Sequence, residues 1–133
     1  MKRGFITGLI LVALAAGAYS STRGTEKGSP REQAFVEFTK QVKLLDVFLK
    51  GDYIVIHDED RMASGGACLF VYRAENGKPG KLVVSYACEP VSREPVNQFT
   101  VRLVNRPSVF DVPEVQEIQF AGSSRAHLVT LAR

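Results

Sequence analysis

From Gly51 onward, apolar and polar residues alternate along the chain, and turn-forming residues interrupt the alternation at short intervals. A period of two places the apolar side chains on one face of a β-strand. Six segments follow this pattern, at residues 53–57, 68–73, 82–91, 97–105, 115–122 and 127–132. Turn formers separate them, as in "ENGKPGK" at 75–81, and Pro90 should end its strand or hold it at a sheet edge. The sequence therefore predicts an antiparallel sheet or partly closed barrel of about six short strands.

The segment before Gly51 has the features of one amphipathic helix. Ser29 suits the N-cap, Pro30 suits the first helical position, and Glu32 completes a capping box. Apolar side chains then recur every three or four residues, and Gly51 should end the helix. This stripe consists of Phe35, Phe38, Val42, Leu45 and Leu49. The expected fold class is α+β, with this N-terminal helix packed on the sheet, although the stripe also suits a coiled coil or a partner helix.

The first eighteen residues have the layout of a secretory signal. Lys2 and Arg3 precede an uncharged apolar run, and the small residues Ala16, Gly17 and Ala18 follow it. We expect cleavage after Ala18, a flexible tether at 19–28, and a single α+β domain at 29–133. The apolar run is shorter than the roughly 20 residues of a membrane span, so an uncleaved anchor is the second interpretation. The predicted location is the periplasm or exterior of a bacterium.

The charge balance argues against a nucleic-acid partner. The chain has 17 basic and 14 acidic residues, and two of the basic ones, Lys2 and Arg3, belong to the signal. The remainder is close to neutral and contains no basic run of the kind that binds a phosphate backbone. We expect an unknown protein or small-molecule partner in the cell envelope, and membrane contact only through an uncleaved signal segment.

The two cysteines, Cys68 and Cys88, are expected to form one disulfide. An exported chain with two cysteines is the usual setting for such a bond. A hairpin turn centred on Lys78 would set Cys68 directly opposite Cys88, and Phe70 opposite Tyr86. A metal site that uses both thiolates, free thiols, or a bond between chains are the alternatives.

The stretch "HDEDRMASGGAC", from His57 to Cys68, gathers metal-ligating side chains. It lacks the glycine and the closing glutamate of a calcium-binding loop. One interpretation is a solvated connection between strands, with Gly65 and Gly66 in a tight loop. The other is a metal or small-ligand site, for copper, formed by His57 and Met62 with His127 as the second imidazole.

No catalytic motif is found, so the expected function is non-enzymatic and no catalytic residue or cofactor is assigned. Ser123 and Ser124 lie near His127 in sequence, but a triad also needs a positioned acid. Three functions remain in order: a binding or interaction module, a metal- or small-ligand-binding protein, and a small hydrolase. The ligand face of the first would consist of Tyr72, Tyr86 and Phe99.

Five stretches together resemble a group of short exported bacterial proteins of unknown function. They are the N-terminal signal, "HDEDRMASGGACLFVYR", "VVSYACEPV", "FTVRL" and "EIQFAGSSRAH", and beyond the signal the resemblance covers roughly residues 35–127. The resemblance implies a bacterial envelope protein and brings no activity, ligand or catalytic residue.

Overall fold

The structure is a computed structural model that describes residues 9–13, 31–106 and 111–129. Over these residues the chain forms nine strands and one short helix. The elements are β1 (Leu9–Ala13), β2 (Arg31–Leu44), β3 (Val47–Asp58), α1 (Glu59–Ala63), β4 (Leu69–Glu75), β5 (Lys78–Tyr86), β6 (Cys88–Ser92), β7 (Thr100–Val104), β8 (Glu114–Gln119) and β9 (Arg125–Val129).

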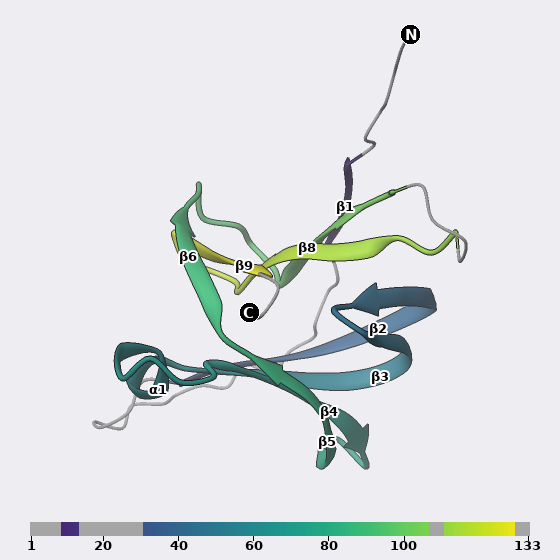
Figure 1. The fold of residues 1–133 in the computed structure, drawn as a ribbon, viewed down its shortest axis with the longest axis horizontal. Coiled ribbons are helices and arrows are strands. Elements are labelled where there is room, and N and C mark those ends of the chain that lie inside the picture. The colour runs from purple at the N-terminus through teal and green to yellow at the C-terminus, as the bar shows by residue number, and fades with distance from the viewer. Residues whose placement is uncertain (1–8, 14–30, 107–110, 130–133) are drawn as a thin grey trace, which may run out of the picture.

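The strands belong to one curled, mixed sheet that folds over into two layers, like half of a barrel (Figure 1). In the lower layer of Figure 1, β2, β3, β4 and β5 pair antiparallel in chain order. In the upper layer, β7 pairs with β1 and β8, and β9 pairs with β8 and β6. Among the described residues, a parallel pairing of β2 with β8 at Lys43 and Glu114 joins the layers, and so does the short chain step from β5 into β6 through Ala87.

The predicted helix is wrong, and with it the α+β fold class. Residues 31–44 form the long strand β2, which pairs with β3 from Arg31 opposite Asp58 to Leu44 opposite Val47. Leu45 begins the tight hairpin turn, with a positive φ of 58°. The cap residues Ser29 and Pro30 lie outside the described residues.

The burial pattern along β2 shows that this segment also suits a strand with one buried face. Ala34, Val36 and Phe38 are buried and alternate, and Val42 and Leu44 resume the alternation after an irregularity in the pairing. Phe38 and Val42 therefore belong both to the predicted helical stripe and to the buried face of the strand. The neighbouring β3 is rich in β-branched and aromatic residues, which suit a pleated strand, and pairing with it settles the choice.

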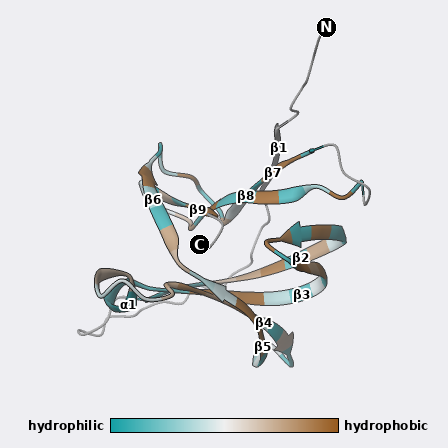
Figure 2. Cartoon of the chain, viewed as in Figure 1, coloured by the Kyte–Doolittle hydropathy of each residue, from teal (hydrophilic) through white to brown (hydrophobic). Residues whose placement is uncertain are grey.

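The core lies between the two layers. Figure 2 shows hydrophobic and hydrophilic segments alternating along β2, β3 and β8. The most deeply buried apolar residues, each 2% exposed or less, include Val36, Leu49, Tyr53, Leu69, Val71, Phe99 and Val101. They come from both layers, so the curl of the sheet is what encloses the core.

The six predicted strands all have counterparts, with one division and one shift of register. The segment 82–91 contributes to both β5 and β6, and Pro90 lies in β6, which pairs only with β9 among the described strands. The β4–β5 hairpin sets Leu69 opposite Tyr86 and Phe70 opposite Ser85, one residue away from the expected register. The hairpin turns at Asn76 and Gly77, which both have a positive φ, rather than around Lys78. Two irregularities near Tyr72 offset part of this difference, because each extra residue in one strand displaces the pairing that follows.

Of the predicted signal segment, the structure describes residues 9–13, which form β1 and pair antiparallel with β7. The expected cleavage site at Ala18 and the tether at 19–28 lie outside the described residues. Among the helices that the structure describes, none is long and apolar enough to cross a membrane.

Candidate metal centre

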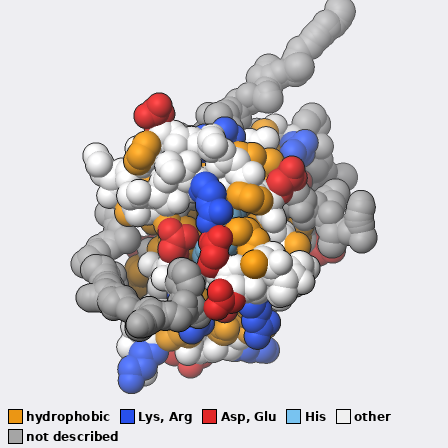
Figure 3. Space-filling view, turned by 90° about the vertical axis from the view of Figure 1, so that its left-hand side faces the viewer, with side chains coloured by type: hydrophobic (Ala, Val, Ile, Leu, Met, Phe, Trp, Pro, Cys, Tyr) orange, Lys and Arg blue, Asp and Glu red, His pale blue; other side chains and the backbone are white. Residues whose placement is uncertain are grey.

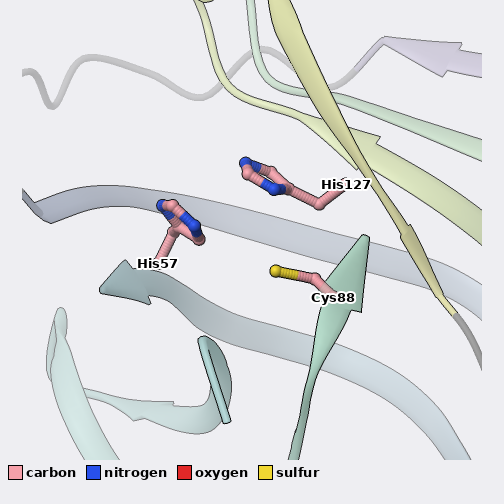
Figure 4. Close-up of side chains that lie close together, drawn as sticks. All are labelled: His57, Cys88 and His127. Carbon is pink, nitrogen blue, oxygen red and sulfur yellow. The ribbon is translucent and has the colours of Figure 1, made fainter. Parts of the chain in front are cut away.

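Two buried histidines face each other between the layers (Figure 4). His57 lies near the end of β3 and is 1% exposed, and His127 lies in β9 and is 0% exposed. Their ring centroids are 4.1 Å apart, with 32° between the ring planes. The site therefore joins two segments that are seventy residues apart in the sequence.

Strand pairing places each histidine. His57 continues the inward-facing series of Tyr53 and Val55, and it pairs with Glu32 of β2 and Leu69 of β4. His127 pairs with Ile118 of β8 and with Pro90 of β6. Because both are held by strands with neighbours on either side, the two imidazoles are set by backbone ladders rather than by a loop.

Three of the four imidazole nitrogens are buried without a hydrogen-bond partner among the described residues. They are Nε2 of His57 and both Nδ1 and Nε2 of His127. The fourth, Nδ1 of His57, lies 3.3 Å from Oε1 of Glu32. A buried polar atom without a partner destabilises a fold by about 1–3 kcal/mol, so this group of three calls for a chemical explanation.

Burial keeps His127 neutral at ordinary pH. Its pKa falls from 6.5 to about 4, chiefly because burial disfavours the charged ring and secondly because His57 lies beside it. A neutral imidazole has a free lone pair, and this is the form of histidine that binds metal ions.

Sulfur atoms lie on one side of the histidine pair. Cys88 begins β6, and its sulfur is directed toward the space between the rings (Figure 4). One ligand atom each from His57, Cys88 and His127 all lie within 4.8 Å of one another. The thioether sulfur of Met62 in α1 is 3.8 Å from Sγ of Cys88.

Cys88 is paired with Cys68 in a disulfide, with the two Cα atoms 6.2 Å apart. This agrees with the predicted pairing, although the two cysteines are not opposite each other within one hairpin as expected. Cys68 precedes β4 and its backbone N–H donates to the Tyr86 carbonyl, whereas Cys88 lies beyond β5 at the start of β6. As a disulfide member, Cys88 is not a thiolate, so the donors at hand are the imidazoles and the Met62 thioether.

The soft donors among the described residues are all gathered here. The sequence contains two His, two Cys and two Met. After Met1, every one of these residues belongs to the cluster or is bonded to it: His57, Met62, Cys68, Cys88 and His127. Of the residues that the sequence suggested for a metal site, the structure brings His57 and His127 together and places Met62 beside their neighbour Cys88.

The surroundings hold this arrangement in place. Phe120 packs 6.3 Å from each imidazole, measured between ring centroids. Glu59 of α1 accepts a 2.6 Å hydrogen bond from Arg125 of β9, which ties the helix that carries Met62 to the strand that carries His127. Figure 3 shows acidic and basic side chains next to each other at the centre of the face it presents, with hydrophobic side chains around them.

Two of the three acidic residues in the His57–Cys68 stretch have structural contacts. Asp58 caps α1 by accepting from the backbone N–H of Arg61, and Glu59 forms the ion pair just described. This stretch connects two strands, as one interpretation of the sequence held, and it also carries Met62 to the site. Near the other histidine, Ser123 bonds the backbone of Arg125 within the turn before β9.

The aromatic residues suggested as a ligand face are mostly in the interior. Tyr86 and Phe99 are 5% and 2% exposed and belong to the core, and Tyr72 is half-buried. Sequence reasoning did not predict that Glu32 and Cys88 lie beside the two histidines. Glu32 was read as part of a helix cap, and only the β2–β3 pairing brings it next to His57.

The donors fit one metal ion with small movements. Two nitrogens bound to the same ion at about 2.0–2.1 Å lie at most about 4 Å apart, so the ligand nitrogens of His57 and His127, which lie within 4.8 Å of each other, need shifts of an ångström or less. Met62 lies next to them through its 3.8 Å contact with Sγ of Cys88. Imidazole and thioether are ligands that suit copper, and imidazole also suits zinc.

No family model, no curated protein and no solved structure matches this chain.

Proposed function

We propose that this protein binds a copper ion in the bacterial envelope, with His57 and His127 as the principal ligands and Met62 as the third. The observation that carries the proposal is the facing pair of buried imidazoles, which have three nitrogens without a hydrogen-bond partner. An ion bound by one nitrogen of each ring would account for the pair. Export through the N-terminal signal is part of this proposal, and the disulfide is compatible with it.

The environment of His57 supports a metal ligand rather than a core histidine. Metal-bound histidines usually direct their second nitrogen to a carboxylate, which sets the tautomer and increases the basicity of the ligating nitrogen. Glu32 occupies this position at Nδ1, which leaves Nε2 as the ligating atom. This role also explains why the partly exposed carboxylate of Glu32, near the start of β2, lies beside the buried ring of His57.

The energetics point the same way. Three unpaired buried nitrogens together destabilise the metal-free fold, whereas coordination of one ion satisfies two of them, one on each ring. Binding energy is then added to folding stability, because the unfolded chain does not hold the two histidines together. Copper ranks above the other divalent ions of its row for such donors, and a thioether favours it further.

The test is thermal unfolding of the disulfide-bonded protein with and without Cu²⁺. A ligand present at about 100 times its Kd stabilises the folded state by about 2.7 kcal/mol, which is on the order of 10 °C for a domain of this size. We expect such a shift with Cu²⁺ and none with Mg²⁺, which prefers oxygen ligands.

Two variants make the assignment specific. The double variant His57→Ala, His127→Ala should lose the Cu²⁺-induced shift completely. The control Asp60→Asn removes an acidic group from the same stretch and should retain it. A shift of equal size in the double variant, or no shift in the unmodified protein, would overturn the proposal.

A further inference from the structure

We infer that the Cys68–Cys88 disulfide controls the metal site, so that its reduction adds the Cys88 thiolate as a ligand and tightens metal binding. The inference rests on the proposed metal-binding function and deepens it. The site then has two forms: His57, His127 and Met62 in the oxidised chain, and the same three with Cys88 in the reduced chain.

The position of Cys88 carries the first step. Its Sγ is already one of the three ligand atoms that lie within 4.8 Å of one another, and it also contacts the Met62 sulfur at 3.8 Å. Opening the disulfide therefore does not require Cys88 to travel. It changes only the chemical state of a sulfur that already faces both imidazoles (Figure 4).

The two cysteines have different surroundings, which assigns them different roles. Cys68 is completely buried, and its Sγ lies 3.9 Å from the Tyr86 carbonyl oxygen, an acceptor for a thiol proton. Cys88 is partly exposed, and the groups facing its sulfur are soft donors. After reduction, Cys68 remains a protonated thiol hydrogen-bonded to the backbone, and Cys88 becomes the ligand.

The chemistry balances with a dithiol reductant, such as a redox protein with two cysteines. Its thiolate attacks one sulfur of the disulfide, a mixed disulfide forms, and its second thiol releases the product. The reductant leaves as a disulfide, and the chain gains two thiols. A metal ion then binds Cys88 and displaces one proton, so each binding event releases that proton to solvent.

The redox state should therefore alter the affinity of the site. A thiolate adds a formal negative charge and a strong soft ligand to a set that otherwise contains only neutral donors. Two imidazoles, one thiolate and one thioether make a four-ligand set of the kind that binds copper or zinc. Reduction thus converts a weak, neutral site into a tight, charged one.

The test measures Zn²⁺ binding by calorimetry, because zinc does not oxidise thiols. The wild-type protein is compared in its disulfide form and after reduction with a phosphine. Two matched variants, Cys68→Ser and Cys88→Ser, both remove the disulfide, but only Cys68→Ser leaves a thiol at position 88. Co²⁺ is used as a second probe, since thiolate ligation gives an intense near-ultraviolet charge-transfer band.

We expect reduced wild type and Cys68→Ser to bind Zn²⁺ at least about tenfold more tightly than the oxidised protein, and both to show the Co²⁺ charge-transfer band. Cys88→Ser should show neither. Equal affinity and spectra in the two serine variants would overturn the redox inference even if histidine-dependent copper binding persists. Loss of copper binding in the oxidised protein would instead overturn the proposed function. If the variants do not fold, the comparison of reduced with oxidised wild type still decides the inference.

Discussion

The buried carboxylate of Glu117 should be a main determinant of stability in the upper layer, and Glu117→Gln tests this. Glu117 lies in β8 and is 2% exposed. Its two oxygens accept hydrogen bonds from Nε and Nη2 of Arg93, at 3.0 and 2.8 Å, and it also bonds Arg102 of β7. This network ties β7 and the segment after β6 to β8, the strand that pairs with β9 and so positions His127.

The magnitude follows from burial. A hydrogen bond to a charged group contributes about 1.5–3 kcal/mol, and breaking a buried ion pair by removing one partner costs about 3–5 kcal/mol. Arg93 and Arg102 have side chains 40% and 19% exposed, so water partly solvates them once the carboxylate is gone. We therefore expect Glu117→Gln to lower the free energy of unfolding by about 2–3 kcal/mol, below the fully buried value.

Glu114→Gln is the matched control on the same strand. Glu114 also interacts with two cations, Arg106 at 2.9 Å and Lys43 at 3.8 Å, but its side chain is 30% exposed. Ion pairs at such positions contribute about 0–1 kcal/mol. Urea unfolding with linear extrapolation gives both values, and 1 M NaCl should cancel most of the Glu114 effect while leaving most of the Glu117 effect. Equal losses in the two variants would refute the argument from burial.

Two further predictions concern the histidine and disulfide pairs. The pKa of His127 is lowered to about 4, so as the pH falls below 6.5 the unfolded chain takes up the proton first. The free energy of unfolding of the metal-free protein should therefore be unaffected by His127 above pH 6.5 and should fall by on the order of 3 kcal/mol between pH 6.5 and 4. Urea unfolding at several pH values measures this loss, which should be absent in His127→Gln. Thiol titration of the unfolded, unreduced protein should find no free thiol. Reduction of Cys68–Cys88 should lower the free energy of unfolding by about 3 kcal/mol, because the twenty-residue separation closes a loop in the unfolded chain; two titratable thiols before reduction would contradict the pairing.

Much of the sheet could be predicted from local pattern. Alternating apolar residues bounded by turn formers mark strands because the pleat turns successive side chains to opposite faces, and this signal needs no knowledge of distant residues. It located the strands around Val55, Val71, Val101 and Ile118. The grouping of His57 with Met62 and His127 as donors also followed from composition, since the chain offers few other soft ligands.

The hairpin of β2 and β3 could not be chosen from the sequence alone. Phe38, Val42 and Leu49 fit a helical stripe, yet Val36 and Phe38 also fit a strand that continues at Val42. Local pattern leaves these options close in energy, and the difference comes from pairing with β3 and from burial between the layers.

The sequence by itself determined which side chains were available: six alternating segments, one pair of cysteines, two histidines and one methionine after Met1. The tertiary structure alone decided where they meet. The curl of the sheet brings β9 over the end of β3, so His127 faces His57 and Cys88 enters beside them. Strand alternation specifies only the face of a strand on which a residue lies, whereas register and sheet curvature, which depend on the whole set of pairings, specify its neighbours.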